Sequence, residues 1–159
     1  FFLFFFVGAL VAQNNQQKNR LGKTAETADT IGNRGEAIVL SLEEKRLREE
    51  GPEDLVENIK HISRDDDSEG YDILSYEADG IPRHIEVKAT TASNLDRGFF
   101  ITNNELEKTK ILSNYYIYLV FSALSKHPKV LPIKNPALDG NSEYILTPIV
   151  YHVKLPLKS

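Results

Sequence analysis

Two charged residues lie two positions apart in a segment that otherwise has the character of a β-strand. Residues 84–91 read HIEVKATT, and the alternation of strand side chains puts Glu86 and Lys88 on one face. The segment 70–77, GYDILSYE, also alternates, and the ADG between the two segments is a turn signal. This pattern predicts a β-hairpin whose charged face is either a solvated ion pair or the wall of a polar site.

The length of the hairpin loop decides whether a third charge joins this face. With a three-residue loop, 78–80, Asp72 lies directly opposite Glu86 and shares its face. With a two-residue loop, Asp72 turns to the opposite face. Both loops are plausible, but Gly80 suits the left-handed position that ends a three-residue loop. We therefore predict the three-residue loop.

Two carboxylates brought together at the end of a hairpin repel each other unless a cation lies between them. Paired hard oxygens with open positions for water and phosphate suit Mg²⁺, with Mn²⁺ as the alternative. A lysine on the same face can neutralise, orient or deprotonate a water beside that cation. The residue types therefore point to phosphodiester hydrolysis.

Other elements must position this face. Apolar residues at helical spacing predict a helix over 31–50, which Gly51-Pro52 ends and which carries Glu36 in its first turn or two. The capping pair Thr102 and Glu105 begins a predicted helix over 103–114. Beside the hairpin, strands are predicted at 56–63, 98–102 and 115–124, with short edge strands in the Pro-rich tail. This order predicts an α/β (α+β) fold, a mixed β-sheet flanked by helices.

Four strings of this chain, in order, resemble a known family. They are IGNRGEAIVL, GYDILSYEADG, HIEVKATT and FFITNNELEKTK, and they look like the C-terminal domain of the plant protein NO VEIN, which also occurs in bacterial helicase-like and restriction-related proteins. The spacing of Glu36, Asp72 and Glu86-Val87-Lys88 resembles that of the PD-(D/E)XK nuclease superfamily, with Tyr71-Asp72 in place of the usual Pro-Asp. The resemblance covers most of the chain, from Ile31 to Pro136.

The resemblance implies a restriction-endonuclease-like core with metal-dependent nuclease activity, in a larger protein that is restriction or defence related. It implies that Asp72, Glu86 and the carbonyl of Val87 bind Mg²⁺ or Mn²⁺. Lys88 would position the attacking water, and Glu36 would support the metal or the lysine from the first helix. The expected partner is nucleic acid, with DNA favoured, and a homodimer would suit cleavage of both strands.

Each of these residues also has a simpler explanation. Glu86 and Lys88 alone could form a cross-strand surface ion pair, worth less than about 1 kcal/mol. The helix macrodipole accounts for a glutamate in a first turn, as expected for Glu36. Asn104 and Lys108 follow a helix start that favours an anion, and we keep them as candidates for phosphate contact.

Several other motifs are better explained without a ligand. The acidic run 65–70 resembles an EF-hand loop at its first six positions, but Tyr76 stands where the bidentate glutamate is needed. The four histidines show no metal-ligand spacing, although His84 shares the face of Glu86. Alternation in a buried strand explains the tyrosines of 115–118 more simply than base stacking does.

Composition limits the function further. With 159 residues, 41% hydrophobic and 26% charged, the chain has the make-up of one soluble domain. A net charge of −4 excludes a surface that grips nucleic acid all over, so such contact needs a local patch. The absence of cysteine excludes disulfides, thiolate zinc sites and cysteine nucleophiles, and it fits an intracellular protein, cytoplasmic or nuclear.

The N-terminal part is set apart from the predicted domain. The apolar run 1–12, FFLFFFVGALVA, is shorter than the roughly 20 residues that span a bilayer, so packing against protein is favoured over a membrane segment. We assign 1–30 to this run and a polar lead-in, and 31–159 to the nuclease-like domain. Because the sequence contains no methionine, we interpret it as a piece of a longer protein or as a processed product.

Two other functions stay open. The first is a catalytically inactive nucleic-acid-binding module on the same fold. The second is a protein-interaction domain in a multidomain protein, which the net acidity and the apolar N-terminus would favour.

Overall fold

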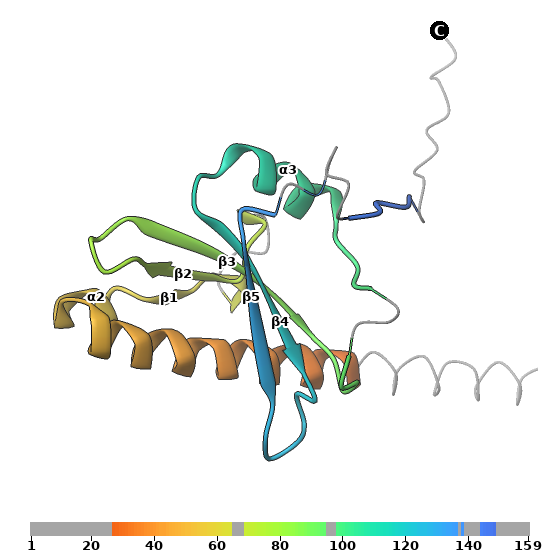
Figure 1. Cartoon of the computed structure of the whole chain (residues 1–159), viewed down its shortest axis with the longest axis horizontal. Coiled ribbons are helices and arrows are strands. Elements are labelled where there is room, and N and C mark those ends of the chain that lie inside the picture. Colours follow the sequence, from red (N-terminus) through yellow and green to blue (C-terminus); the bar gives the residue numbers. More distant parts are fainter. Residues whose placement is uncertain (1–26, 65–68, 95–97, 137, 139–143, 149–159) are drawn as a thin grey trace, which may run out of the picture.

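In the part of the chain that the structure describes, a five-stranded sheet lies at the centre (Figure 1). The structure is a computed structural model that describes residues 27–64, 69–94, 98–136, 138 and 144–148. The strands follow one another across the sheet in sequence order, β1 to β5, and only β3 and β4 are parallel. Their bounds are Lys60–His61 (β1), Ile73–Tyr76 (β2), Pro82–Ala89 (β3), Tyr115–Phe121 (β4) and Lys129–Lys134 (β5).

Helices cover the two faces of the sheet. A long helix, helical over residues 27–50, packs on one face through Val39 and its apolar neighbours. The short helix α3 (Asn103–Ile111) packs on the other face through Leu106. It lies in the connection between the parallel strands β3 and β4, as a parallel crossover requires. The predicted α/β fold, a mixed sheet with flanking helices, is therefore confirmed.

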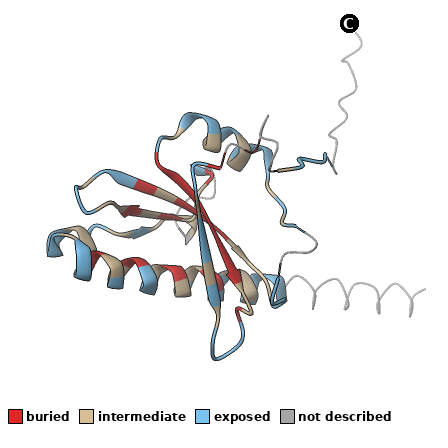
Figure 2. Cartoon of the chain, viewed as in Figure 1, coloured by how far each residue is buried: buried red, intermediate tan, exposed pale blue. Residues whose placement is uncertain are grey.

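The burial pattern follows from the alternation of side chains on β3. Ile85 and Val87 face the long helix and join its core, so Glu86 and Lys88 must point to the α3 side. Strand β4 is buried along almost its whole length, because both of its faces are covered. Figure 2 shows this as buried residues along the sheet-facing side of the long helix and along β4.

The hairpin has the predicted three-residue loop. The Glu77 N–H donates to the Ile81 carbonyl at 2.8 Å, and Gly80 adopts a φ of 87°, the left-handed position expected for it. The ladder pairs Ile73 with Ile85. One residue further in the same register, Asp72 lies opposite Glu86, as predicted.

A buried network fixes the second half of the long helix to the sheet. Glu43 is fully buried, and its carboxylate accepts hydrogen bonds from Arg46 (2.6 Å), Ser75 (2.8 Å), Arg83 (3.2 Å) and Tyr118 (2.6 Å). These partners come from the helix itself and from β2, β3 and β4. Because every strand of the sheet's centre contributes a donor, the network sets the position of the helix along the sheet.

The first half of the helix approaches the sheet at Gly35. A Cβ atom at this position would lie 2.5 Å from the Cβ of Ala89 on β3, closer than side-chain carbons can approach. Gly35 therefore allows the helix backbone to lie directly on the end of β3. This contact places the next residue, Glu36, beside the sheet.

Two predicted strands differ from the structure. The segment 56–63 holds the end of α2 (Glu53–Glu57), the two-residue β1 and the 3₁₀ turn η1 (Ile62–Arg64). It curls because the N–H groups of Ile62 and Ser63 both bond to the Asp72 carbonyl, at 2.7 and 3.2 Å. The segment 98–102 is not a strand.

The outcome for the remaining predicted elements varies. Phe99 and Ile101 pack onto the α3-side core without pairing, which explains the apolar pattern of 98–102. The predicted helix over 103–114 ends at Ile111, and the tail supplies the edge strand β5, whereas 144–148 form no strand. The run 1–12 and the centre of the acidic run, 65–68, lie outside the described residues. None of the helices in the described ranges is long and apolar enough to cross a membrane.

Two helical glycines give opposite predictions. Gly35→Ala should destabilise the fold by about 1–3 kcal/mol, because the new methyl group overlaps Ala89. Gly32→Ala should stabilise it by about 0.5–1 kcal/mol, because nothing lies within 4 Å of a Cβ there and alanine is the better helix former. Urea unfolding of the two variants checks this, and equal effects would contradict the close approach at Gly35.

Candidate functional site

Asp72 is held at the end of the β2–β3 ladder from three directions. Its N–H donates to the Ile85 carbonyl at 2.9 Å, and its carbonyl accepts the two N–H groups of η1. Its side-chain Oδ2 accepts the Val87 N–H at 2.7 Å. The carboxylate therefore accepts the β3 N–H that a further residue of β2 would accept if the ladder continued, and this bond holds it against β3.

The same contact orients the Val87 carbonyl. In a strand the N–H and C=O of one residue point to the same edge. Because the Val87 N–H points at Asp72, its carbonyl also points to the Asp72 side and not to β4. The main-chain oxygen that the family resemblance assigns to a metal is thus turned toward the carboxylate expected to share that metal.

Lys88 joins two glutamates on the α3 side of the sheet. Its Nζ donates to Glu86 Oε1 and to Glu105 Oε2, both at 2.7 Å. Glu86 is only 5% exposed. The pair Glu86–Lys88 is therefore not a solvated surface ion pair, and the sequence-based alternative for it is wrong.

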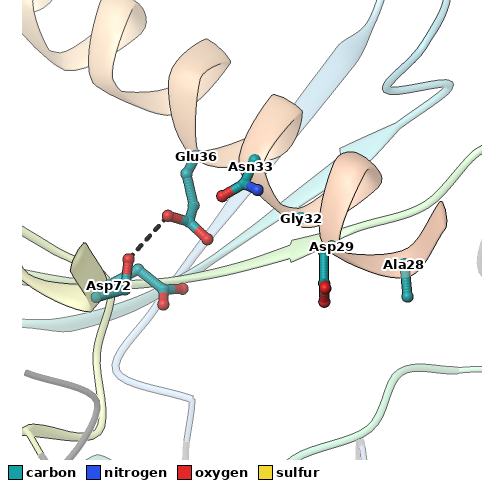
Figure 3. A pocket seen from close by; sticks show the side chains of 7 residues that line it. Ala28, Asp29, Gly32, Asn33, Glu36 and Asp72 are labelled. Atoms are coloured by element: carbon teal, nitrogen blue, oxygen red, sulfur yellow. Dashed lines mark hydrogen bonds between the residues drawn. The ribbon is translucent and has the colours of Figure 1, made fainter. Parts of the chain in front are cut away.

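Glu36 approaches from the long helix. Its Oε2 accepts a hydrogen bond from Ser63 Oγ at 2.8 Å, drawn as the dashed line in Figure 3, and contacts His61 Nε2. The helix is already formed at residue 27, so Glu36 lies at least nine residues inside it. The prediction that Glu36 lies in the first turn or two of the helix is therefore wrong. The macrodipole acts only within a terminal turn and does not explain this glutamate.

A pocket opens between the long helix and Asp72 (Figure 3). It has a volume of about 490 Å³. Among its described lining residues three are acidic and none is basic: Ala28, Asp29, Gly32, Asn33, Glu36, Ser63 and Asp72. The pocket gives Asp72 a route to solvent from the helix side.

Burial and neighbouring carboxylates raise the pKa of Asp72 and of Glu86. Burial raises the pKa of Glu86 to about 8, with repulsion from Asp72 adding to the effect and Lys88 opposing it. Burial likewise raises the pKa of Asp72 to about 6, with repulsion from Glu36 adding and the Val87 hydrogen bond opposing. Burial lowers the pKa of Lys88, but its interactions with Glu86 and Glu105 outweigh this and raise it. A single ammonium thus does not balance the carboxylates around it.

The oxygen atoms present fit a hard divalent cation. Two carboxylates and one main-chain carbonyl are ligands that Mg²⁺ accepts together with water. The described residues contain no group of three or more His, Cys, Asp or Glu side chains that could hold a metal. A cation here would therefore rest on Asp72, Glu86, the Val87 carbonyl and water, with Glu36 outside its direct ligands.

The candidates for phosphate contact lie elsewhere. Asn104 and Lys108 pack over Gly70, where a Cβ would lie 2.9 Å from Asn104 Nδ2 and 2.8 Å from Lys108 Cγ. Lys108 Nζ lies 3.9 Å from Glu69. The structure thus gives both residues a packing role beside the loop before β2, and their contact with nucleic acid stays a prediction.

The tyrosines of β4 have partners inside the fold. Tyr115, Tyr116 and Tyr118 donate their hydroxyls to the Gly70 carbonyl, Glu77 and Glu43, at 2.8, 2.8 and 2.6 Å. His84 meets the ring of Tyr71 edge-on, with centroids 5.0 Å apart. These contacts agree with the structural explanation of the aromatic residues.

Sequence reasoning missed Glu105, His61 and Ser63 as neighbours of the site. Glu105 was explained fully by its capping box, and that box is present. Its second role depends on how α3 folds back over β3, which no local pattern encodes. His61 and Ser63 were placed in a strand, and the 3₁₀ turn that brings Ser63 to Glu36 carries no recognised sequence signal.

The comparisons with known proteins give one match. Residues 35–133, more than half of the chain, match the family model described as "Protein NO VEIN, C-terminal". The matched range begins at the glycine that touches β3 and ends within β5. No curated protein and no solved structure matches the chain.

The raised pKa values predict how stability depends on pH. Asp72 and Glu86 titrate near 3.8 and 4.5 when unfolded, and near 6 and 8 when folded. Between these values the native state binds more protons than the unfolded state, so stability should fall as pH rises from about 4.5 to 8. Because one pKa unit corresponds to about 1.4 kcal/mol, Glu86→Gln should remove on the order of 4 kcal/mol of this loss of stability by pH 8.

Urea unfolding from pH 4.5 to pH 8.5 measures this effect. Below pH 4.5 the lowered pKa of Glu77, about 2, acts in the opposite direction, so the two effects separate in pH. Glu44→Gln, on the long helix away from the site, is the control. A wild-type stability that is flat or rises between pH 5 and 8 would contradict the assigned proton uptake.

Proposed function

We propose that this chain, which belongs to the family of the NO VEIN C-terminal domain, is a metal-dependent phosphodiester hydrolase domain of the PD-(D/E)XK type. The observation that carries the proposal is the juxtaposition of Asp72 with Glu86 and Lys88 at the end of the hairpin. Asp72 is locked against β3 by the Val87 N–H, and Lys88 is locked onto Glu86. The proposed substrate class is nucleic acid, with DNA favoured.

The chemistry divides among the residues as follows. Asp72, Glu86 and the Val87 carbonyl would hold Mg²⁺ or Mn²⁺, which supplies charge neutralisation for the phosphate and activation of water. Lys88, tied to Glu86, would hold the attacking water by hydrogen bonding and favour its deprotonation. Burial removes competing solvent from this face and strengthens each electrostatic interaction.

Glu36 supports the proposal from a second position. It does not reach the proposed cation directly, but it repels Asp72 electrostatically and therefore favours a cation beside that carboxylate. It also fixes η1 through Ser63. We infer that Glu36 strengthens the binding of a cation in two ways. Its charge attracts the cation, and it holds the turn whose N–H groups donate to the Asp72 carbonyl.

A second candidate function is a catalytically inactive nucleic-acid-binding module. Two features favour it: both neighbouring glutamates already engage Lys88, and the described residues offer no group of three metal-binding side chains. Such a module would bind nucleic acid in a manner that weakens with salt and does not need a divalent cation. Binding measurements with and without Mg²⁺ separate the two functions.

The proposal predicts a specific pattern of cation binding. Titration calorimetry at low salt and pH 8 should show one Mg²⁺ or Mn²⁺ bound by the wild type and none bound by Asp72→Asn. Asp79→Asn, in the exposed hairpin loop, removes the same charge 7 residues away and should bind as the wild type does. Equal binding by all three proteins would contradict a cation at Asp72.

Cleavage assays give the second prediction. Lys88→Met should reduce hydrolysis of DNA by at least about a hundredfold, the usual contribution of a positioned acid–base group, while circular dichroism shows an intact fold. Single-stranded and double-stranded DNA and RNA are tested in parallel. Cation binding without cleavage of any substrate, together with salt-sensitive DNA binding in EDTA, would favour the inactive module.

A further inference from the structure

Lys88 is held by two glutamates that come from different elements. Glu86 lies two residues earlier on β3, whereas Glu105 lies on α3, beyond the long connection that follows β3. The Nζ atom is 2.7 Å from a carboxylate oxygen of each. The side chains of Lys88, Glu86 and Glu105 are 19%, 7% and 14% exposed, so this is a largely buried three-residue cluster.

The Glu105 carboxylate is fixed by the start of its own helix. Its Oε2 accepts the Thr102 N–H at 3.1 Å, while the Glu105 N–H donates to Thr102 Oγ1 at 3.2 Å. The same Oε2 is the atom that accepts from Lys88. A negative charge is favourable at a helix N-terminus. The position of the Glu105 carboxylate therefore does not depend on its interaction with the cluster that contains Glu86.

The helix that carries Glu105 is in turn fixed to the sheet. Leu106, the next residue, packs in the core formed by Tyr115 and Ile117 of β4. Tyr115 and Ile117 pair with His84 and Glu86 in the parallel ladder. The position of Glu105 relative to Lys88 is thus set by strand pairing and core packing, not by a flexible surface side chain.

The two glutamates meet different demands in the proposed reaction. A divalent cation on Asp72 and Glu86 repels the Lys88 ammonium and competes with it for the Glu86 carboxylate. Lys88 must nevertheless stay at the site to hold the attacking water. Glu105 faces Lys88 from the α3 side and is not opposite Asp72 in the hairpin, so it can retain the lysine while Glu86 binds the cation.

We propose that Glu105 is a positioning residue that keeps the Lys88 ammonium at the site when a divalent cation occupies Glu86. This inference rests on the proposed function of the site. Without Glu105, Lys88 has Glu86 as its one direct carboxylate partner among the ion pairs of the described residues. The Lys88 ammonium and the cation then compete for the Glu86 carboxylate, and each weakens the binding of the other to it.

Glu105→Gln tests this role without removing the helix cap. Glutamine also serves at the third position of a capping box, so the variant loses the charge but keeps α3. Glu107→Gln is the matched control, because Glu107 lies on the same helix, is exposed and pairs with Lys110 at 3.0 Å instead of Lys88. Equal thermal unfolding of both variants and the wild type shows that the fold is unchanged.

Two readouts are compared on the full chain, with Mg²⁺ alone as the probe. Calorimetry should show Mg²⁺ binding about tenfold weaker in Glu105→Gln than in the wild type or Glu107→Gln, as expected for loss of a charged hydrogen bond. The ¹⁵N NMR signal of the Lys88 ammonium should persist when Mg²⁺ is added to the wild type and to Glu107→Gln. In Glu105→Gln, Mg²⁺ should abolish it, because the released ammonium exchanges rapidly with water.

A double-mutant cycle separates action through Lys88 from a direct charge effect. In a Lys88→Met background, Glu105→Gln should change Mg²⁺ affinity less than about twofold, since the lysine that it positions is gone. A full tenfold effect in that background overturns the positioning role. So does a Glu105→Gln variant that matches Glu107→Gln in both affinity and the Lys88 signal.

The proposed function fails in a distinguishable way. If the wild type binds no Mg²⁺, the cation site and the positioning role are both overturned. If the wild type binds Mg²⁺ and Glu105→Gln matches Glu107→Gln in both Mg²⁺ affinity and the Lys88 signal, only the positioning role is overturned.

Discussion

Two carboxylates, the partly buried Asp72 and the buried Glu86, lie opposite each other where the β2–β3 ladder ends. Asp72 cannot rotate away, because the Val87 N–H holds its carboxylate and three further hydrogen bonds hold its backbone. Glu86 is only 5% exposed, and its backbone pairs with Ile117 of β4. Since like charges that are shielded from water destabilise each other, a positive charge at this end of the sheet is stabilising. The Lys88 ammonium neutralises the two carboxylates only in part, as the raised pKa values of both acids indicate.

The same molecule also contains a buried carboxylate, Glu43, whose negative charge is fully compensated by its partners. Glu43 accepts hydrogen bonds from two arginines, a serine and a tyrosine. Burial raises the pKa of Glu43, but the bonds from Arg46 and Tyr118 and the charge of Arg83 outweigh it, so that the pKa is lowered. The contrast distinguishes two roles for buried acids. Glu43 is neutralised and joins the helix to the sheet, whereas Asp72 and Glu86 are left short of cations on the opposite end of the same hairpin.

The sequence predicted the parts of the site that depend on local geometry. Strand alternation placed Glu86 with Lys88, and the choice of a three-residue loop at Gly80 placed Asp72 opposite them, because hairpin register follows from loop length. The capping box at Thr102 was also correct. The mixed sheet followed from the order of the elements.

The sequence did not predict what depends on chain segments meeting in space. The apolar residues of 98–102 suggested a strand, but Phe99 and Ile101 pack onto the α3-side core and the segment forms no strand. The helix containing Glu36 starts before the apolar pattern that predicted it, because residues 27–30, which that pattern does not include, are helical too. Glu105 reaches Lys88 only because the β3–α3–β4 crossover returns over β3. In each case tertiary contacts decide, and a one-dimensional pattern does not contain them.

A crystal structure of this domain with Mn²⁺, with data collected at the manganese edge, tests most directly whether Asp72 and Glu86 form a cation site. We expect one anomalous peak within about 2.5 Å of carboxylate oxygens of both Asp72 and Glu86, as oxygen-ligated divalent cations require, with Lys88 still in contact with Glu105. An anomalous map without a peak there, at a Mn²⁺ concentration that fills other sites, would contradict the claim that these two acids form a cation site.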